Sequence, residues 1–289
     1  MSTKEALDAY DDCSAKIFAR GNRKVWSLSE RFRSKALRKV IEDIVEKRGM
    51  GEELLDPKEP EKGKVFVCVV PSNDLTKTEV IRSFRTDIYH PWDEHVKIWE
   101  AARATTAASS YFKPQELGSG PTPQTYIDAA IRANNPVYHL RREAAAEFGS
   151  ARRLGCLVSI GTGTREIQLS GIRGFIRAPS YYWQLAGALK NQVTDCEAAH
   201  RELESTLSAF PGAYFRFNVP RMAETVGLSH YKKIPAIKSS TCQYLAKNDV
   251  SMRVRQAAEA LKTEAFDCGL TLGHISGKKP TSSLPPHDR

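Results

Sequence analysis

Hydrophobic residues near the N-terminus recur three to four positions apart, which is the spacing of one face of an α-helix. They are Ala6, Tyr10, Cys13 and Ile17. The preceding Ser2-x-x-Glu5 pattern is a capping box, in which two side chains satisfy free backbone N–H groups. The pattern therefore predicts an amphipathic helix that starts with the first residues and ends near Gly21.

A second helix is predicted after another capping box, Ser27-x-x-Glu30. The apolar positions expected on its buried face are Phe32, Ala36, Val40, Ile41, Ile44 and Val45. Gly49 is expected to end this helix, because glycine readily adopts the left-handed conformation that follows a helix C-terminus.

Four short segments carry the pattern of β-strands instead. Residues 64–70 (KVFVCVV) and 156–160 (CLVSI) are apolar at successive positions, which is typical of strands in a sheet covered on both faces. Residues 79–85 alternate more strongly and predict a neighbouring strand nearer the sheet edge. Residues 213–219 also alternate like a strand.

Further helical patterns separate these strands. They begin at Pro91 and Asp93, at Asn135 and Pro136, near Pro179, and at Asp249. Residues 56–64 and 113–124 are rich in proline with glycine or charge, so we expect loops there. Two buried strands separated by helices indicate an α/β architecture with a mainly parallel sheet, followed by extra C-terminal helices.

The length of 289 residues, with 41% hydrophobic and 27% charged residues, is that of a globular protein that buries a sizeable core. We expect one domain over residues 1–276. Residues 277–289 are rich in proline, serine and charge, and we expect them to form a disordered tail.

The formal net charge of +9 would favour an anionic partner such as a membrane surface. Most basic residues, however, alternate with acidic ones along helical segments, which is typical of solvated helix faces. Aromatic residues do not interleave with the arginines, so we expect no binding of nucleic acid.

The six cysteines lie far apart, and the seven histidines lack zinc-type spacing. We therefore expect free thiols, mostly buried, with no metal and no cofactor. The chain has neither an apolar run of membrane-spanning length nor an N-terminal signal region. These features predict a cytoplasmic protein, either free or attached peripherally to a membrane.

Asp128 is the candidate for chemistry that its surroundings favour. It ends a short apolar run (YID), and a helix start at Asn135 and Pro136 follows it. Sheets of α/β proteins present catalytic groups at such strand ends. An aspartate that only caps a turn has the same local pattern, so both interpretations stay open.

Other motifs are less specific. Gly161-Thr-Gly163 follows a predicted strand but lacks the third glycine and the lysine of phosphate-binding loops, which favours a simple turn. No G-x-S-x-G serine elbow is present, and residues 227–231 (GLSHY) lack its second glycine. Five arginines could attract anionic head groups or pair with Glu143 and Glu147. They are Arg132, Arg141, Arg142, Arg152 and Arg153.

Three segments together resemble a known family. Residues 99–112 (WEAARATTAASSYF) resemble an A-x-A-T-S-A-A-P-x-x-F run, residues 128–137 (DAAIRANNPV) resemble a D-G-G or D-G-A motif, and residues 156–163 (CLVSIGTG) resemble an S-I-G-T-G strand end. In this order and spacing they look like the C-terminal part of a patatin-like phospholipase domain of the fungal multidomain kind. The resemblance covers about residues 1–270.

The resemblance implies an α/β/α sandwich, of which this chain holds a part, and a lipid acyl hydrolase with a Ser-Asp dyad. In such a dyad the serine attacks the ester carbonyl, the aspartate orients or deprotonates it, and a glycine-rich loop stabilises the oxyanion. Asp128 is the residue that carries over. No residue of this chain matches the serine or the oxyanion loop, which would lie upstream of the first helix.

Two expectations follow from this mismatch. The chain resembles a lipid hydrolase but is expected to be inactive by itself, a truncated domain or pseudoenzyme whose partner is the missing N-terminal half-domain or another chain. An alternative is a non-catalytic module that binds a membrane or a protein. Ala129 and Ala130 replace glycines of the motif, and a positive φ there would strain alanine by about 1 kcal/mol or more.

Overall fold

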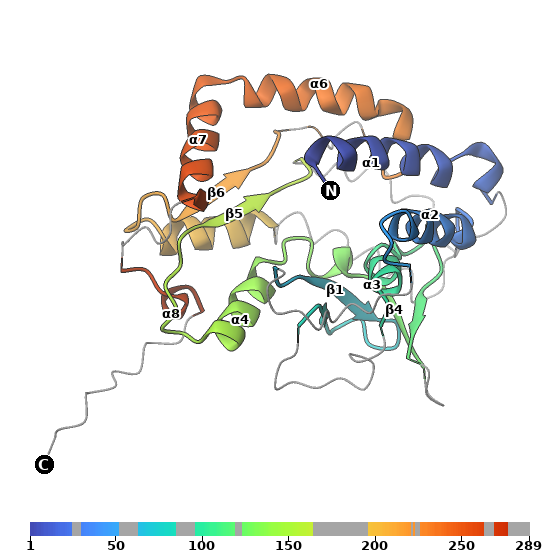
Figure 1. Cartoon of the computed structure of the whole chain (residues 1–289), viewed down its shortest axis with the longest axis horizontal. Coiled ribbons are helices and arrows are strands. Elements are labelled where there is room, and N and C mark those ends of the chain that lie inside the picture. The colour runs from blue at the N-terminus through green and yellow to red at the C-terminus, as the bar shows by residue number, and fades with distance from the viewer. Residues whose placement is uncertain are drawn as a thin grey trace, which may run out of the picture. The chain divides into compact units, whose positions relative to one another are not determined.

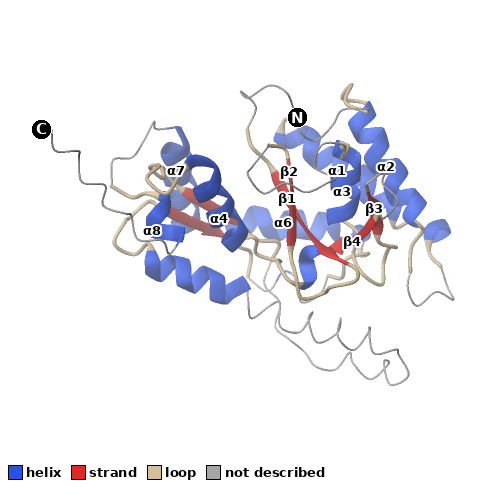
Figure 2. Ribbon diagram, turned by 90° about the horizontal axis from the view of Figure 1, so that it is seen from below, coloured by secondary structure: helices blue, strands red, loops and turns tan. Residues whose placement is uncertain are grey.

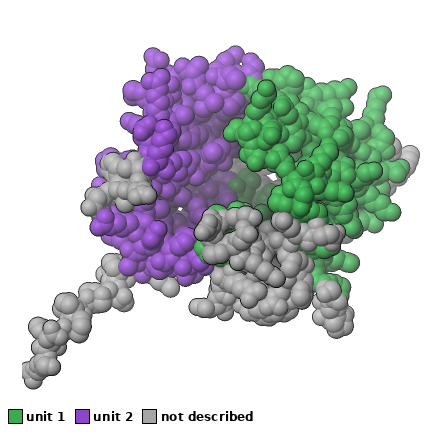
Figure 3. Space-filling view, in the orientation of Figure 1, with its two compact units in different colours: residues 1–134, 166–193, 223–238 green, residues 135–165, 194–222, 239–289 purple. Residues whose placement is uncertain are grey.

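The computed structural model describes residues 1–24, 30–51, 63–84, 96–118, 123–163, 196–220, 222, 226–262 and 269–276. The chain divides into two compact units, coloured separately in Figure 3. Unit 1 comprises residues 1–134, 166–193 and 223–238, and unit 2 comprises residues 135–165, 194–222 and 239–289. The predicted tail, residues 277–289, lies outside the described residues, and the predicted domain boundary stays a prediction.

Unit 1 holds a four-stranded sheet with the strand order β2-β1-β4-β3 (Figure 2). Its strands are β1 (Phe66–Pro71), β2 (Glu79–Arg82), β3 (Gln115–Leu117) and β4 (Gln124–Asp128). The first two confirm the predicted strands, and β2 lies at an edge as expected. The expected loop at residues 113–124 was wrong in part, because β3 pairs with β4 and so satisfies its backbone groups.

The α/β class is confirmed, but the strand directions differ from the prediction. All three pairings in the unit 1 sheet are antiparallel. Among the described strands, parallel pairing joins β5 (Leu157–Ile160) to β6 (Tyr214–Phe217) in unit 2. For β1 and β2 the reason is connection length, because β2 follows β1 after a short turn, whereas a parallel pair needs a long crossover such as the one between β5 and β6.

Three α-helices of unit 1 precede β4 in the chain. They are α1 (Thr3–Ile17), α2 (Ser34–Glu46) and α3 (Ile98–Thr105), and a 3₁₀ turn, η1 (Arg20–Asn22), follows α1. The capping box of α1 is confirmed, since the Ser2 and Glu5 side chains both accept the expected backbone N–H groups. Pro91 and Asp93, the expected start of the third helix, lie outside the described residues.

The helix α2 begins later than predicted. The first helical residue is Ser34, whose N–H donates to the Glu30 carboxylate at 2.8 Å, and the preceding Arg33 has an extended backbone. Phe32 therefore lies before the helix, although it is buried as expected. Ser27, the other half of the predicted capping box, lies outside the described residues.

The sheet of unit 1 is buried on both faces, as its apolar strands predict. Val69, Ile81 and Tyr126 pack with Ala101 and Ala104 of α3 in one cluster. The alternate positions of the same strands form a second cluster with the turn after β4: Cys68, Val70, Val80, Ile127, Ala129 and Ile131. Figures 1 and 2 both show α3 beside β1 and β4.

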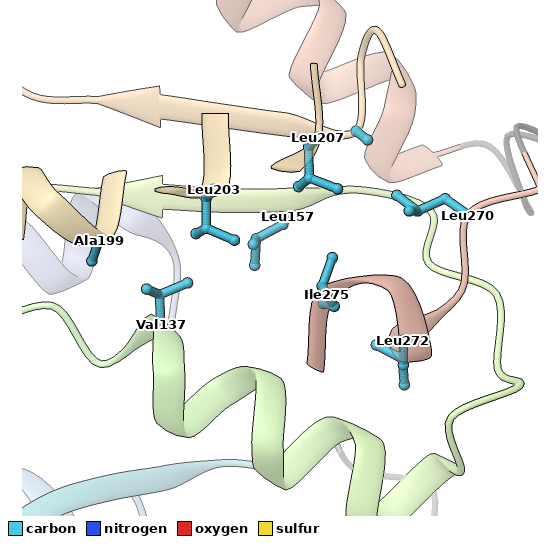
Figure 4. Packing of buried hydrophobic residues seen from close by; sticks show 9 residues of the cluster. Val137, Leu157, Ala199, Leu203, Leu207, Leu270, Leu272 and Ile275 are labelled. Atoms are coloured by element: carbon cyan, nitrogen blue, oxygen red, sulfur yellow. The ribbon is translucent and has the colours of Figure 1, made fainter. Parts of the chain in front are cut away.

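Unit 2 has its own core around the β5–β6 pair. Its other described elements are α4 (Val137–Phe148), helical residues 196–206, α7 (Asn248–Lys262) and α8 (Leu272–Ser276). Leu157, Leu203 and Ile275 point into one common space in Figure 4, with Val137 beside them. The helix α6 (Ile234–Leu245) follows the short η5 turn (Tyr231–Lys233) and enters unit 2 at residue 239.

The predicted helix from Asp249 is found as α7, but only part of its expected apolar face is covered. Val250 and Ala257 are buried, whereas Val254 and Leu261 are exposed. Most of the long helix predicted from Pro179 lies outside the described residues, and its described part, residues 196–206, is helical.

Candidate active site

Asp128 is the last residue of β4, and its main chain is held from two sides. It lies opposite Val69 of β1 in the antiparallel ladder. Its N–H donates to the carbonyl of Ala107 at 3.1 Å, in the turn that follows α3. Strand and helix thus fix the backbone from which the carboxylate projects.

The Asp128 side chain caps a short turn. Its Oδ1 accepts the N–H of Ala130 at 2.8 Å, at the start of the 3₁₀ turn η2 (Ala129–Ile131). Removal from water raises the pKa of the half-buried carboxyl to about 6, and the Ala130 N–H opposes this rise. The two interpretations of Asp128 are therefore compatible, because a turn-capping carboxyl with a pKa near 6 can also exchange protons near neutral pH.

Ala129 and Ala130 fit this turn without the strain that a positive φ would have imposed. Neither has a positive φ, since both lie in a 3₁₀ turn whose conformation suits alanine. Among the described non-glycine residues, Ser110 is the one with a positive φ, at 66°. Alanine at these two positions therefore adds no left-handed strain beside Asp128.

The segment 99–112 supplies α3 and the turn that contacts Asp128. Small side chains let the helix approach the sheet closely, and Ala104 and Ala107 are fully buried. Thr105 Oγ1 donates to the Cys68 carbonyl of β1 at 2.8 Å. The sequence pattern indicated this segment but not the burial of Arg103, for which a single arginine among small residues was the available signal.

The Gly161–Gly163 segment forms a turn after β5, as predicted. Gly163 donates its N–H to Asn218 Oδ1 at 2.8 Å, and Asn218 follows the neighbouring strand β6. Arg216 Nη1 donates to Ser159 Oγ at 2.8 Å on the same strand pair. A Cβ on Gly161 would lie 2.4 Å from Asn218 Oδ1, so these side chains require glycine there. The polar groups at this turn bind one another.

Arg141 and Arg142 make ion pairs within unit 2. Arg141 lies 3.0 Å from Glu202, and Arg142 lies 3.5 Å from Glu143. Glu143 was an expected partner, whereas Glu202 lies too far away in the sequence to be inferred from helix spacing. The Arg142 side chain nevertheless stays largely exposed to solvent.

The described cysteines are free thiols, and the expectation that they are mostly buried holds in part. Cys68 is buried and Cys242 is exposed, while Cys13, Cys156 and Cys196 lie between these extremes. Among the described residues, no group of three or more His, Cys, Asp or Glu could hold a metal ion. His90 and His95 lie outside them.

Helices in the part of the chain that the structure describes are too short or too polar to cross a membrane.

Comparison with known proteins assigns the Asp128 region to a family. The family model described as patatin-like phospholipase matches residues 2–141, a shorter range than the one expected from the motifs. The human calcium-independent phospholipase A2-gamma is 31% identical over 159 residues, which are 54% of this chain and 19% of that protein. The rat protein of the same name is 29% identical over 224 residues, or 74% and 27% of the two chains.

A patatin-like phospholipase 1 of Plasmodium falciparum is 27% identical over 207 residues, which are 63% of this chain and 30% of that protein. The chain therefore spans less than a third of these relatives' lengths. The matched range contains the 99–112 segment, Asp128 and the turn that it caps. Residues 2–141 of this chain hold a patatin-like phospholipase domain.

Proposed function

We propose that this chain supplies the aspartate of a lipid acyl hydrolase, a carboxylic ester hydrolase that acts through a Ser-Asp dyad. The observation that carries the proposal is Asp128 itself, fixed at a strand end inside the family match with a pKa near 6. A carboxylate of this pKa is ionised at pH 7 yet basic enough to accept a proton from a nucleophile.

In the proposed reaction a serine Oγ attacks the ester carbonyl while its proton passes to Asp128. Collapse of the tetrahedral intermediate expels the alcohol, which takes that proton, and water then hydrolyses the acyl-serine. The sequence contains no G-x-S-x-G elbow and no glycine-rich oxyanion loop. We therefore propose that this chain is the C-terminal part of the catalytic domain and that a separate segment supplies both.

The proposal is tested by assaying the purified chain with p-nitrophenyl butyrate and with a fluorophosphonate probe that labels activated serines. We expect neither turnover above background nor labelling. Turnover that disappears in Asp128→Ala would show that the chain contains its own nucleophile. Conversely, fusion to the segment that holds the serine should create turnover that depends on Asp128.

The second candidate function is a non-catalytic module that attaches peripherally to an anionic membrane. The observation that favours it is that α4 exposes three large apolar or aromatic side chains, Tyr138, Leu140 and Phe148. Arg142 on the same helix is also exposed, and Arg152 and Arg153 follow its end. Apolar and cationic side chains together are typical of surfaces that bind anionic lipids.

Sedimentation with liposomes distinguishes this candidate. Binding to phosphatidylserine vesicles at physiological salt that is retained in Asp128→Ala and lost in Phe148→Asp would support it. Leu228→Asp, at an exposed leucine of unit 1, is the matched control. Equal sedimentation with phosphatidylcholine vesicles, or none with either, would contradict it.

A further inference from the structure

The turn after α3, residues 106–113, contacts Asp128 directly. The Ala107 carbonyl accepts the Asp128 N–H at 3.1 Å, and Ala107 is fully buried. Any shift of this turn would therefore move the acceptor that holds the last residue of β4.

The turn has a conformation that its sequence does not favour by itself. Ser110 has a φ of 66°, in the left-handed region that residues other than glycine seldom occupy. Such a conformation persists where surrounding contacts impose it. Residues 30–34 provide one set: Arg31 N–H donates to the Ser110 carbonyl, and Phe32 N–H donates to the Tyr111 carbonyl.

Arg103 provides the second set, from inside the molecule. Its side chain is 2% exposed, and its Nη2 donates to the Lys113 carbonyl at 2.8 Å. The guanidinium lies 5.9 Å from the centre of the Phe112 ring. Because the Lys113 N–H donates to Ser34 Oγ at 2.8 Å, Lys113 at the end of the turn is held through both its N–H and its carbonyl.

A buried cation in this position costs free energy that an apolar side chain would not. Burial lowers the pKa of Arg103 to about 10, the Glu30 carboxylate opposes this, and Arg38 adds to the lowering. Glu30 is itself buried; burial opposes its ionisation, but hydrogen bonds from Lys24 and Ser34 lower its pKa to about 2. Both groups are thus charged at pH 7, and packing alone does not account for a buried arginine.

We infer that Arg103 is a positioning residue for Asp128. By holding the Lys113 carbonyl at the C-terminal end of the 106–113 turn, it keeps the whole turn in place, so that the Ala107 carbonyl can accept the Asp128 N–H. The inference rests on the proposed function only in giving Asp128 a chemical role. The contacts reach Asp128 through the main chain, so Arg103 itself touches no reacting atom.

Amide hydrogen exchange followed by NMR tests this inference without any assay of activity. In Arg103→Met we expect the Asp128 amide to exchange at least tenfold faster than in the wild type. The Ser72 amide, which donates to Thr125 across the β1–β4 ladder, should stay within twofold and reports on global opening. The titration midpoint of the Asp128 carboxyl should also fall from about 6 toward its ordinary value, because the loosened turn admits water.

Arg38→Met is the control, since the Arg38 side chain bonds Glu42 within α2 at 2.7 Å and lies over the Trp99 ring at 4.3 Å. It should leave both Asp128 readouts unchanged.

If Arg103→Met does not fold, Arg103→Lys keeps the cation and should show the same local change to a smaller extent. Equal acceleration at Ser72 and Asp128, or unchanged exchange at Asp128, would overturn the inference. Neither result would bear on the hydrolase proposal, which the probe and turnover assays decide.

Discussion

At the scale of single residues, Asp128 shows how burial changes the chemistry of a common side chain. The pKa of its carboxyl is raised because the charged form loses water, and the single N–H of Ala130 replaces only part of that hydration. Between about pH 4 and pH 6, therefore, the Asp128 carboxyl is protonated in the native state but ionised in the unfolded state. Ionised Asp128 destabilises the fold at neutral pH.

Asp128→Asn should stabilise the protein at neutral pH. The amide still offers an oxygen to Ala130 but carries no charge, so we expect a gain of about 2 kcal/mol at pH 7.5. Because both states of Asp128 become protonated in acid, the gain should shrink as the pH falls from 6 and be absent near pH 3. Urea unfolding of both proteins across this pH range measures the gain. Stability curves that run parallel with pH would contradict the raised pKa of Asp128.

Gly161→Ala should destabilise unit 2 through a steric clash. The added Cβ would lie 2.4 Å from Asn218 Oδ1 and 3.1 Å from Arg216 Nη2, so either the Asn218 side chain must move away from the Gly163 N–H that it accepts or the turn after β5 must shift. We expect a loss of about 1–3 kcal/mol, as for overpacking elsewhere. Gly155→Ala is the control, because a Cβ there meets nothing within 4 Å. Equal thermal shifts in the two variants would refute the proposed contact.

At the scale of elements, α1 is stabilised differently along its length. Ser14 and Ile17 are buried near its C-terminal end, whereas Tyr10, predicted to face inward, is 63% exposed. The helical spacing of its apolar residues was correct, but spacing does not reveal whether a neighbour covers the first two turns. The first turn is held by the capping box and by an ion pair between Glu5 and Arg48 at 3.6 Å.

Ser2→Ala should therefore loosen the start of α1 without unfolding the molecule. Loss of the bond to the Glu5 N–H costs about 1 kcal/mol. We expect several-fold faster amide exchange at residues 4–8 and little change in the global unfolding midpoint. Lys4→Ala, at an exposed position with no capping bond, should leave these amides unchanged. An equal loss of protection throughout unit 1 would show that the first turn is coupled to the core.

At the scale of the whole molecule, the buried hydrophobic residues gather in separate clusters. Among the described residues, three clusters lie in unit 1 and one lies in unit 2 around Leu203. Because each cluster packs within its own unit, a cavity in one should affect that unit first.

Leu203→Ala should destabilise unit 2 selectively. Leu203 is fully buried, and removal of such a leucine costs about 2–5 kcal/mol through lost contacts and the cavity left behind. We expect amide protection to fall in β5 and β6 and to be retained in β1 and β4. Leu261→Ala, at a leucine that is 68% exposed, should have little effect. Equal loss in both units would indicate one cooperative core.

Local patterns determined which segments form elements and where the candidate site lies. Apolar spacing predicted β1, β2, α1 and α7, and the end of the apolar run marked Asp128. These features depend on the conformational preferences of neighbouring residues, which the sequence displays directly. The motifs around Asp128 also indicated the resemblance to the patatin-like phospholipase model that matches residues 2–141.

The tertiary structure alone decided strand direction, burial and the environment of the site. The antiparallel order β2-β1-β4-β3, the short strand β3 and the late start of α2 depend on partners distant in the sequence. The same holds for the pKa of Asp128 and for the contacts of Arg103, since desolvation and buried charge depend on the neighbours that folding supplies. Spacing along a chain can place a carboxylate on a turn, but only packing changes its affinity for a proton.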